Sequence, residues 1–301
     1  METIDHIRLF LIESPIKMTR LQGVGNVKGS VKRVIVELTS SSGVVGWGEA
    51  APWEVFTGTA EGAYSAIDIY MRQHIIGKPV HRVRDLMMAL DRVLVGHGEA
   101  KVAVEMAMFD IIGKLSNLSV ADLLGGRVRD EIPLSFSIAD PDFEADIERM
   151  HRMVPEGNAL YKVKTGVKPH REDLAHLEAI RKAFGDTIDL RLDYNQALKP
   201  FGAISILREV DQFRPTFIEQ PVPRDCLAAM ASFADALDTP ILADESCFHA
   251  RDLLDLLQAK AADAISVKLM KSGGILKAQA LMAIADAAHI PGYGGTLWEG
   301  G

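Results

Sequence analysis

Three acidic residues recur at nearly equal spacing in the second half of the sequence. Asp193, Glu219 and Asp244 lie 26 and 25 residues apart, and each stands at the end of a short apolar stretch. A single acid at the end of a strand could equally well cap the next helix or lie on the surface. Three at this spacing make an all-oxygen set of the kind that Mg²⁺ prefers. The pattern therefore predicts a Mg²⁺ site formed by these three carboxylates.

Lysines stand on either side of these acids in the sequence. In the segment ALYKVKTG (159–166), Lys162 and Lys164 would share one face of a strand. Two close ammonium groups disfavour each other's charge, which lowers the pKa of at least one and suits it to proton transfer. Lys268 would approach from the other side of the site. The alternative is a solvated pair of lysines, which suits a half-exposed strand better than a parallel strand covered on both faces.

The elements that position these residues begin near residue 131. Short apolar strands alternate there with amphipathic helical stretches, which is typical of βα units on a parallel sheet. In a β/α barrel the carboxyl ends of such strands carry the catalytic groups. Because a barrel needs eight strands and the sequence reaches residue 301 after the seventh, we expect a barrel truncated after its seventh strand; an open doubly wound sheet is the alternative. The seven predicted strands are 132–138, 159–166, 188–195, 216–221, 240–246, 264–269 and 289–295.

The first part of the chain has a different pattern. Alternating β-rich runs within residues 1–57 predict an antiparallel sheet, and three-and-four spacing of apolar residues predicts helices within 58–77, 83–96 and 100–117. We therefore predict two domains: an α+β domain over residues 1–130 and a β/α barrel over 131–301.

Composition narrows the class of protein. The formal net charge of −8 and the lack of a basic block argue against a nucleic-acid partner, and no apolar run is long enough to span a membrane. The beginning of the sequence lacks the basic region of a signal peptide, and Cys226 and Cys247 fit no disulfide framework. We expect a cytoplasmic protein that binds a small molecule.

Taken together, the motifs at these positions resemble the enolase superfamily, specifically its muconate lactonizing enzyme (muconate cycloisomerase) subgroup. The resemblance covers essentially the whole chain, and GWGEAAP, ending at Pro52, resembles the capping domain of that family. It implies an N-terminal α+β capping domain, a modified (β/α) barrel, one Mg²⁺ ion at Asp193, Glu219 and Asp244, and acid/base roles for Lys164 and Lys268. The matching segments are KVK (162–164), DYN (193–195), EQP (219–221), ADES (243–246) and KLMKSGG (268–274).

The implied chemistry is the removal or return of a proton at the α-carbon of a small carboxylate, through an enediolate whose charge Mg²⁺ and Lys162 would stabilise. Three overall reactions fit the resemblance: muconate-type cycloisomerisation, epimerisation of a dipeptide, and epimerisation or dehydration of a proline-type amino acid such as hydroxyproline. A homo-oligomer is also expected. The substrate-binding residues that we predict are Lys162, Asn195, Glu299, Trp53 and Trp298.

Two other classes remain open from the residues alone. Lys268 would be a Schiff-base nucleophile in one, which leaves the three carboxylates without a task. The other is a non-catalytic binding protein, which predicts no Mg²⁺ site. We further expect residues 19–30, which contain three glycines, to form either a loop that closes over the ligand or a plain surface loop.

Overall fold

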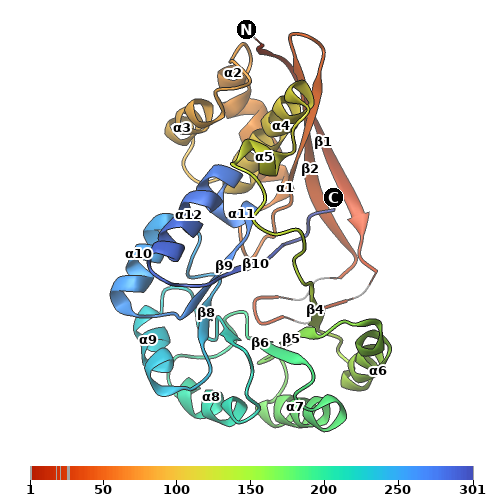
Figure 1. The fold of residues 1–301 in the computed structure, drawn as a ribbon, viewed down its shortest axis with the longest axis vertical. Helices are drawn as coiled ribbons and strands as arrows, with labels where there is room; N and C mark the ends of the chain where they lie inside the picture. Colours follow the sequence, from red (N-terminus) through yellow and green to blue (C-terminus); the bar gives the residue numbers. More distant parts are fainter. Residues whose placement is uncertain (1, 18, 21, 26–27, 301) are drawn as a thin grey trace.

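The computed structural model describes residues 2–17, 19–20, 22–25 and 28–300. Figure 1 shows a small antiparallel sheet with helices beside it, standing above a curled parallel sheet that is ringed by helices. No helix in the described part of the chain combines the length and the apolar character that a membrane crossing requires. The arrangement confirms the predicted fold class, a capping domain and a barrel-like β/α domain.

The N-terminal sheet has the order β1-β2-β3, with β1 (Ile4–Pro15), β2 (Ser30–Ser40) and β3 (Val45–Ala50) all antiparallel. The predicted sheet in residues 1–57 is therefore confirmed. A helix crosses β3 so closely that a Cβ atom on Gly48 would lie 1.8 Å from the carbonyl oxygen of Ala103. Glycine at this position lets the helix rest directly on the strand backbone.

Helices lie at the three positions that the apolar spacing predicts, and one short helix, Val120–Leu123, follows outside the predicted ranges. The first predicted helix contains a π-helical stretch in its middle, and the longest helix, α4, is buried along most of its length. These helices and the inner face of the sheet share one hydrophobic core. The elements are α1 (Ala60–Ser65), η1 (Ala66–Met71), α2 (Arg72–Ile75), α3 (Val83–Val93), α4 (Gly98–Ser116) and α5 (Val120–Leu123).

Seven parallel strands form the second sheet, in the order β10-β9-β8-β7-β6-β5-β4, so each strand pairs with its neighbour in sequence. All seven predicted strands are confirmed. The strands are β4 (Ser135–Ile138), β5 (Leu160–Lys164), β6 (Asp189–Asp193), β7 (Ile218–Glu219), β8 (Ile241–Ala243), β9 (Ala264–Val267) and β10 (Gly292–Gly294). The helices are α6 (Phe143–Met153), η2 (Val154–Glu156), α7 (His170–Phe184), α8 (Ala203–Asp211), α9 (Leu227–Ala236), α10 (Ala250–Ala259), α11 (Leu269–Ser272) and α12 (Ile275–Ala287).

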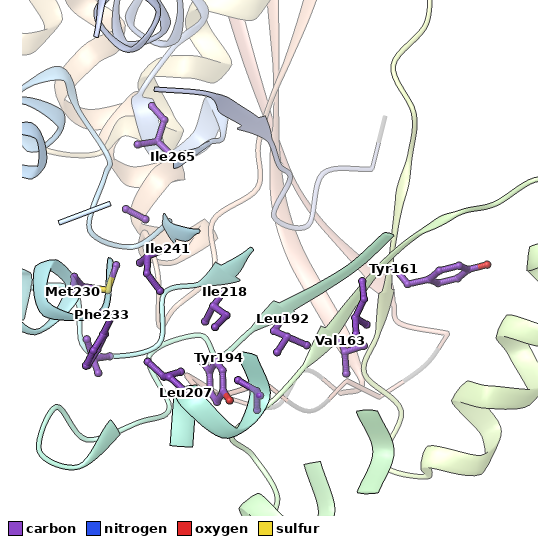
Figure 2. Close-up of a cluster of buried hydrophobic side chains, with 14 of the residues drawn as sticks. Tyr161, Val163, Leu192, Tyr194, Leu207, Ile218, Met230, Phe233, Ile241 and Ile265 are labelled. Atoms are coloured by element: carbon purple, nitrogen blue, oxygen red, sulfur yellow. The ribbon is translucent and has the colours of Figure 1, made fainter. Parts of the chain in front are cut away.

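The outer face of this sheet is apolar and packs against the helices. Figure 2 shows Tyr161 and Val163 of β5 and Leu192 of β6 within this core, and all three are buried. Because side chains alternate between the faces of a strand, the residues between them point into the sheet's concave side. The predicted alternation, with Tyr161 and Val163 toward the helices and both lysines inward, is confirmed.

The two parts of the molecule are joined by a buried carboxylate. Glu105 of α4 accepts hydrogen bonds from the backbone N–H groups of Ile275 and Leu276, the first residues of α12. It thereby satisfies donors that have no partner within the helix. Gly274 has a φ of +142°, a backbone conformation that favours glycine, and a Cβ atom there would lie 2.5 Å from the end of the Glu105 side chain. The domain boundary predicted between residues 130 and 131 lies in the segment between α5 and β4 and stays a prediction.

Candidate active site

Five charged residues stand in a row across five neighbouring strands. Lys164 ends β5, Asp193 ends β6 and Glu219 ends β7, and their Cα atoms are paired in register. Asp244 follows β8 and Lys268 follows β9 at the same edge. The order along the sheet is therefore lysine, aspartate, glutamate, aspartate, lysine. The structure brings together the predicted acid/base and metal-binding residues.

On one flank of this row, two lysines bind Asp193. The Lys164 Nζ atom lies 2.5 Å from Asp193 Oδ2, and the Lys162 Nζ atom lies 3.3 Å from the same oxygen and 2.8 Å from Glu219 Oε2. Burial lowers the pKa of Lys164 despite the charge of Asp193, and the Lys162 ammonium adds to this effect. Burial opposes the charge on Lys162 too, but Glu219 and Asp193 outweigh it and raise the pKa of Lys162 well above 10.5.

On the other flank, two further lysines bind Asp244. The Lys268 Nζ atom lies 2.5 Å from Asp244 Oδ2, and the Lys271 Nζ atom lies 2.8 Å from Asp244 Oδ1. Lys271 also donates to the carbonyl oxygen of Ser266 at 2.6 Å. Burial alone would raise the pKa of Asp244, but the two ammonium groups outweigh it and lower the pKa far below its usual value. Burial opposes the Lys268 charge, yet Asp244 and Glu219 raise the pKa of Lys268.

The three carboxylates fit a Mg²⁺ ion by their chemistry and position. Asp193, Glu219 and Asp244 are fully or almost fully buried at adjacent strand ends, and the Oε1 atom of Glu219 has no hydrogen-bond partner among the described residues. Burial and the charge of Asp193 raise the pKa of Glu219, although the nearby Lys162 ammonium group opposes this effect. Within the described residues, no three acidic, histidine or cysteine side chains already stand in a metal-binding geometry. Lysine contacts hold these carboxylates instead, so the predicted ligand set stays a prediction.

Asn195 lines the same pocket as Lys164 and Asp193, although it is almost fully buried. It is 3% exposed, its Oδ1 atom accepts a hydrogen bond from Lys164 at 2.6 Å, and its Nδ2 atom donates to Glu245 at 3.2 Å. Its φ of +42° lies in the left-handed region, which is uncommon for residues other than glycine and is frequent at functional sites.

A pocket of about 260 Å³ opens onto the row of charges. Trp53 and Trp298 both line it, and their rings meet edge to face at 6.1 Å. Glu299 is placed differently, because its Oε2 atom accepts a hydrogen bond from the backbone N–H of Leu297 and the residue is absent from the described lining. Its role in substrate binding stays a prediction.

The predicted loop at 19–30 contributes to the pocket. Arg20 and Gln22 line it, and the Arg20 guanidinium lies 5.5 Å from the Trp298 ring centroid. Residues 21, 26 and 27 of the predicted loop lie outside the described residues. Closure of the loop over a ligand stays a prediction.

Comparison with known proteins identifies this architecture. Residues 10–125 match the family model of the mandelate racemase / muconate lactonizing enzyme N-terminal domain, and residues 145–300 match the enolase C-terminal domain-like model. The chain belongs to the mandelate racemase and muconate lactonizing enzyme family. The predicted membership of the enolase superfamily is therefore confirmed. Proteins of this family are isomerases, epimerases and cycloisomerases, so the chain is an enzyme.

Members of the family resemble the chain along most of its length. L-Ala-D/L-Glu epimerase of Bacillus subtilis (strain 168) is 34% identical over 273 residues, which are 90% of this chain and 74% of that protein. The crystal structure of a muconate cycloisomerase from Azorhizobium caulinodans is 66% identical with a TM-score of 0.90, covering 100% of this chain and 80% of that one. Dipeptide epimerase from Enterococcus faecalis V583, complexed with Mg and the dipeptide L-Leu-L-Tyr, is 30% identical with a TM-score of 0.92, covering 98% and 82%.

Two residues of the site, Lys271 and Glu245, were given no role from the sequence. Lys271 lies within the KLMKSGG segment, and its spacing of three from Lys268 is a signal that could have placed both on one side of a helical turn. Glu245 stands out in the sequence only as the neighbour of Asp244. No sequence signal indicates its contact with Asn195, because that contact depends on the conformation of two turns.

Proposed function

We propose that this chain is a Mg²⁺-dependent acid/base enzyme that acts at the α-carbon of a small carboxylate, of the muconate cycloisomerase type. One observation carries the proposal: the buried row in which Lys164 and Lys268 flank Asp193, Glu219 and Asp244 across five strands. So many buried charges are costly unless they are paired or bind a cation. Lys164 and Lys268, at the two ends of the row, would act as general base and general acid on opposite sides of a bound substrate.

The lysines divide the proton chemistry between them. The lowered pKa of Lys164 makes the neutral amine accessible, so its Nζ atom is suited to take a proton from the α-carbon. The raised pKa of Lys268 keeps its ammonium group protonated, so it is suited to return a proton on the other side. The Lys162 ammonium group stays charged and would hold the substrate carboxylate.

Asp193, Glu219 and Asp244 would hold the Mg²⁺ ion, with the unpartnered Oε1 atom of Glu219 available to it. Bound there, Mg²⁺ would supply positive charge that stabilises the negative charge developing on the substrate carboxylate. The Enterococcus faecalis dipeptide epimerase, whose crystal structure is a complex with Mg and a dipeptide, supports both the metal and the class of small-molecule ligand.

Cycloisomerisation and epimerisation share this half-reaction. The 66% identity with the Azorhizobium caulinodans muconate cycloisomerase favours the first. The 34% identity with the Bacillus subtilis L-Ala-D/L-Glu epimerase keeps the second as the alternative. Epimerisation or dehydration of a proline-type amino acid is a third candidate that rests on the sequence, without a comparison that favours it.

The Schiff-base alternative fits the site poorly. A nucleophilic lysine must be neutral, whereas the Lys268 ammonium group is held by Asp244 at 2.5 Å and its pKa is raised. Substrate trapping with borohydride would detect such an intermediate, and we expect none.

The central experiment measures exchange of α-protons into deuterated water. The protein is incubated with a library of small carboxylates, including muconate derivatives and dipeptides, with Mg²⁺ and with EDTA. We expect deuterium at the α-carbon only when Mg²⁺ is present. Exchange that proceeds equally well in EDTA would rule out the proposed mechanism. The products separate the two reactions, because cycloisomerisation closes a lactone ring whereas epimerisation equilibrates two stereoisomers.

Three wider proposals come from the sequence alone. The capping domain would span residues 1–130 and the barrel domain 131–301. The protein would be cytoplasmic and homo-oligomeric. Limited proteolysis, cell fractionation and light scattering test these proposals in turn.

A further inference from the structure

Glu245 has no role in the row of charges, yet it is buried beside it. It follows Asp244 and is 2% exposed. Its Oε1 atom accepts a hydrogen bond from Asn195, and its Oε2 atom has no partner in the described part of the chain. A carboxyl group buried at such a cost calls for an explanation.

The turn that carries Glu245 is held in place by one side chain. The Gln220 Oε1 atom accepts hydrogen bonds from the backbone N–H groups of Asp244 and Ser246, both at 3.0 Å. The Gln220 Nε2 atom donates to the Ser246 hydroxyl at 2.8 Å. Glu245 lies between these two anchored residues, so its carboxyl group is a fixed point near the site.

The amide of Asn195 spans the space between this fixed point and Lys164. An ammonium group only donates hydrogen bonds, so Asn195 must turn its Oδ1 atom toward Lys164. Its Nδ2 atom then faces the acceptor Oε1 of Glu245. Reversing the amide would set donor against donor on one side and acceptor against acceptor on the other. Glu245 thus selects a single orientation for the amide.

We propose that Glu245 is a positioning residue for Lys164: by holding the Asn195 amide, it fixes the direction from which the Lys164 Nζ atom meets the substrate. The inference rests on the acid/base role proposed for Lys164. Both lysines are bound by an aspartate at 2.5 Å, but only Lys164 also binds the Asn195 amide; the hydrogen bond of the Lys268 ammonium group goes to Asp244. Loss of the Glu245 contact should therefore affect one side of the substrate only.

Two variants separate positioning from charge. Glu245→Leu removes both the charge and the acceptor, whereas Glu245→Gln removes the charge but keeps an oxygen for the Asn195 amide. A purely electrostatic effect would appear equally in both variants. Should leucine at position 245 prevent folding, Glu245→Ala carries the same comparison.

The first measurement requires neither metal nor substrate. Asparagine occurs only at positions 26, 117, 158 and 195, so selective ¹⁵N-asparagine labelling gives few side-chain amide signals, and Asn195→Ser assigns the relevant pair. We expect Glu245→Leu to shift the Asn195 signals and Glu245→Gln to leave them nearly in place. Asn158, whose Nδ2 atom donates to the carbonyl oxygen of Met153, is the internal control. Unchanged Asn195 signals in Glu245→Leu would overturn the inference.

The second measurement follows α-proton exchange on each side of the substrate. The side served by Lys164 is defined as the one whose exchange is lost in Lys164→Ala, and the other by Lys268→Ala. We expect Glu245→Leu to slow exchange on the Lys164 side about tenfold, with KM within about twofold, and to leave the Lys268 side nearly unchanged. Glu245→Gln should stay within about threefold on both sides.

The outcomes are distinct. Equal slowing on both sides, or none on either, contradicts positioning by Glu245. If the unaltered enzyme exchanges no α-proton from any carboxylate, the proposed function is wrong, while the amide signals still decide whether Glu245 orients Asn195.

Discussion

The two flanks of the site use the same parts in different ways. On each flank, one buried aspartate is held by two lysines at 3.3 Å or less. The lysines of the Asp193 flank lie two residues apart on strand β5. Those of the Asp244 flank, Lys268 and Lys271, lie three residues apart, where β9 passes into α11. Strand spacing and helical spacing thus bring two ammonium groups to one carboxylate by separate routes.

The flanks differ in how the charges are shared. Lys162 is shared between Asp193 and Glu219, and its charge adds to burial in lowering the pKa of Lys164. On the other flank, Lys271 is turned toward backbone carbonyl oxygens as well as Asp244, and the pKa of Lys268 is raised. The pKa values of two lysines in similar surroundings are therefore shifted in opposite directions because their neighbours are arranged differently.

The largest effect should come from deleting one flank's acid/base group. Lys164→Ala is expected to slow α-proton exchange on its side by about 10² to 10⁴-fold, the range typical of general acid–base residues. Lys268→Ala should do the same on the other side. Exchange is measured by mass spectrometry with each stereoisomer separately. If both variants lose exchange on the same side, the two lysines do not act on opposite sides of the substrate.

The next effect concerns stability and tests the Asp244 flank. Lys271→Met should lower the free energy of unfolding by about 3 kcal/mol, because the buried Asp244 loses one of its two counter-charges. Lys277→Met is the matched control. Its ion pair with Asp91 is 2.8 Å long but both side chains are more than a third exposed, so about 1 kcal/mol or less is expected. Urea unfolding measures both, and equal losses would contradict the structural role of Lys271.

The pH dependence should distinguish the two lysines. Lys164 must be neutral to take a proton, and its pKa is lowered, so exchange started by Lys164 should rise with pH and reach half its maximum below 10.5. Lys268 has a raised pKa, so exchange started by Lys268 should reach half its maximum at a higher pH than exchange started by Lys164. Rate profiles for the two stereoisomers measure this difference. If the two rate profiles superimpose, the inferred difference in pKa between Lys164 and Lys268 is wrong.

The smallest effect is expected at the pocket wall, which both flanks share. Trp298→Leu should raise KM several-fold on both sides of the substrate and leave kcat nearly unchanged, because Trp298 lines the pocket without contacting the lysines or carboxylates through a hydrogen bond. Trp47→Leu, on the exposed side of strand β3, is the control and should change neither constant. A selective effect of Trp298→Leu on one stereoisomer would assign this residue to one flank.

Much of this arrangement follows from spacing along the sequence. Alternation in β5 places Lys162 and Lys164 on the same face, and one βα unit between successive acids places Asp193, Glu219 and Asp244 at one edge. Both results depend only on strand periodicity and on the parallel order of the sheet. These are the parts of the site that sequence reasoning predicted.

The remaining contacts depend on turns whose conformation is not visible in the sequence. Asn195 reaches both Lys164 and Glu245 from a left-handed backbone position, and Gln220 fixes the turn around Glu245 from a neighbouring strand. Glu299 illustrates the reverse case, since its carboxylate turns back to the N–H of Leu297 two residues earlier. In each case a few hydrogen bonds, rather than periodicity, decide where the side chain lies.

The contact of Glu105 with the start of α12 bears on recombination between related enzymes. In a chimera with its capping domain from one protein and its barrel from another, Glu105 and the start of α12 come from different proteins. Without a carboxylate at position 105, the N–H groups of Ile275 and Leu276 would be buried without this acceptor, and a side chain larger than glycine at position 274 would collide with it. A chimera that keeps a carboxylate at position 105 and glycine at position 274 is therefore expected to be more stable than one that loses either residue.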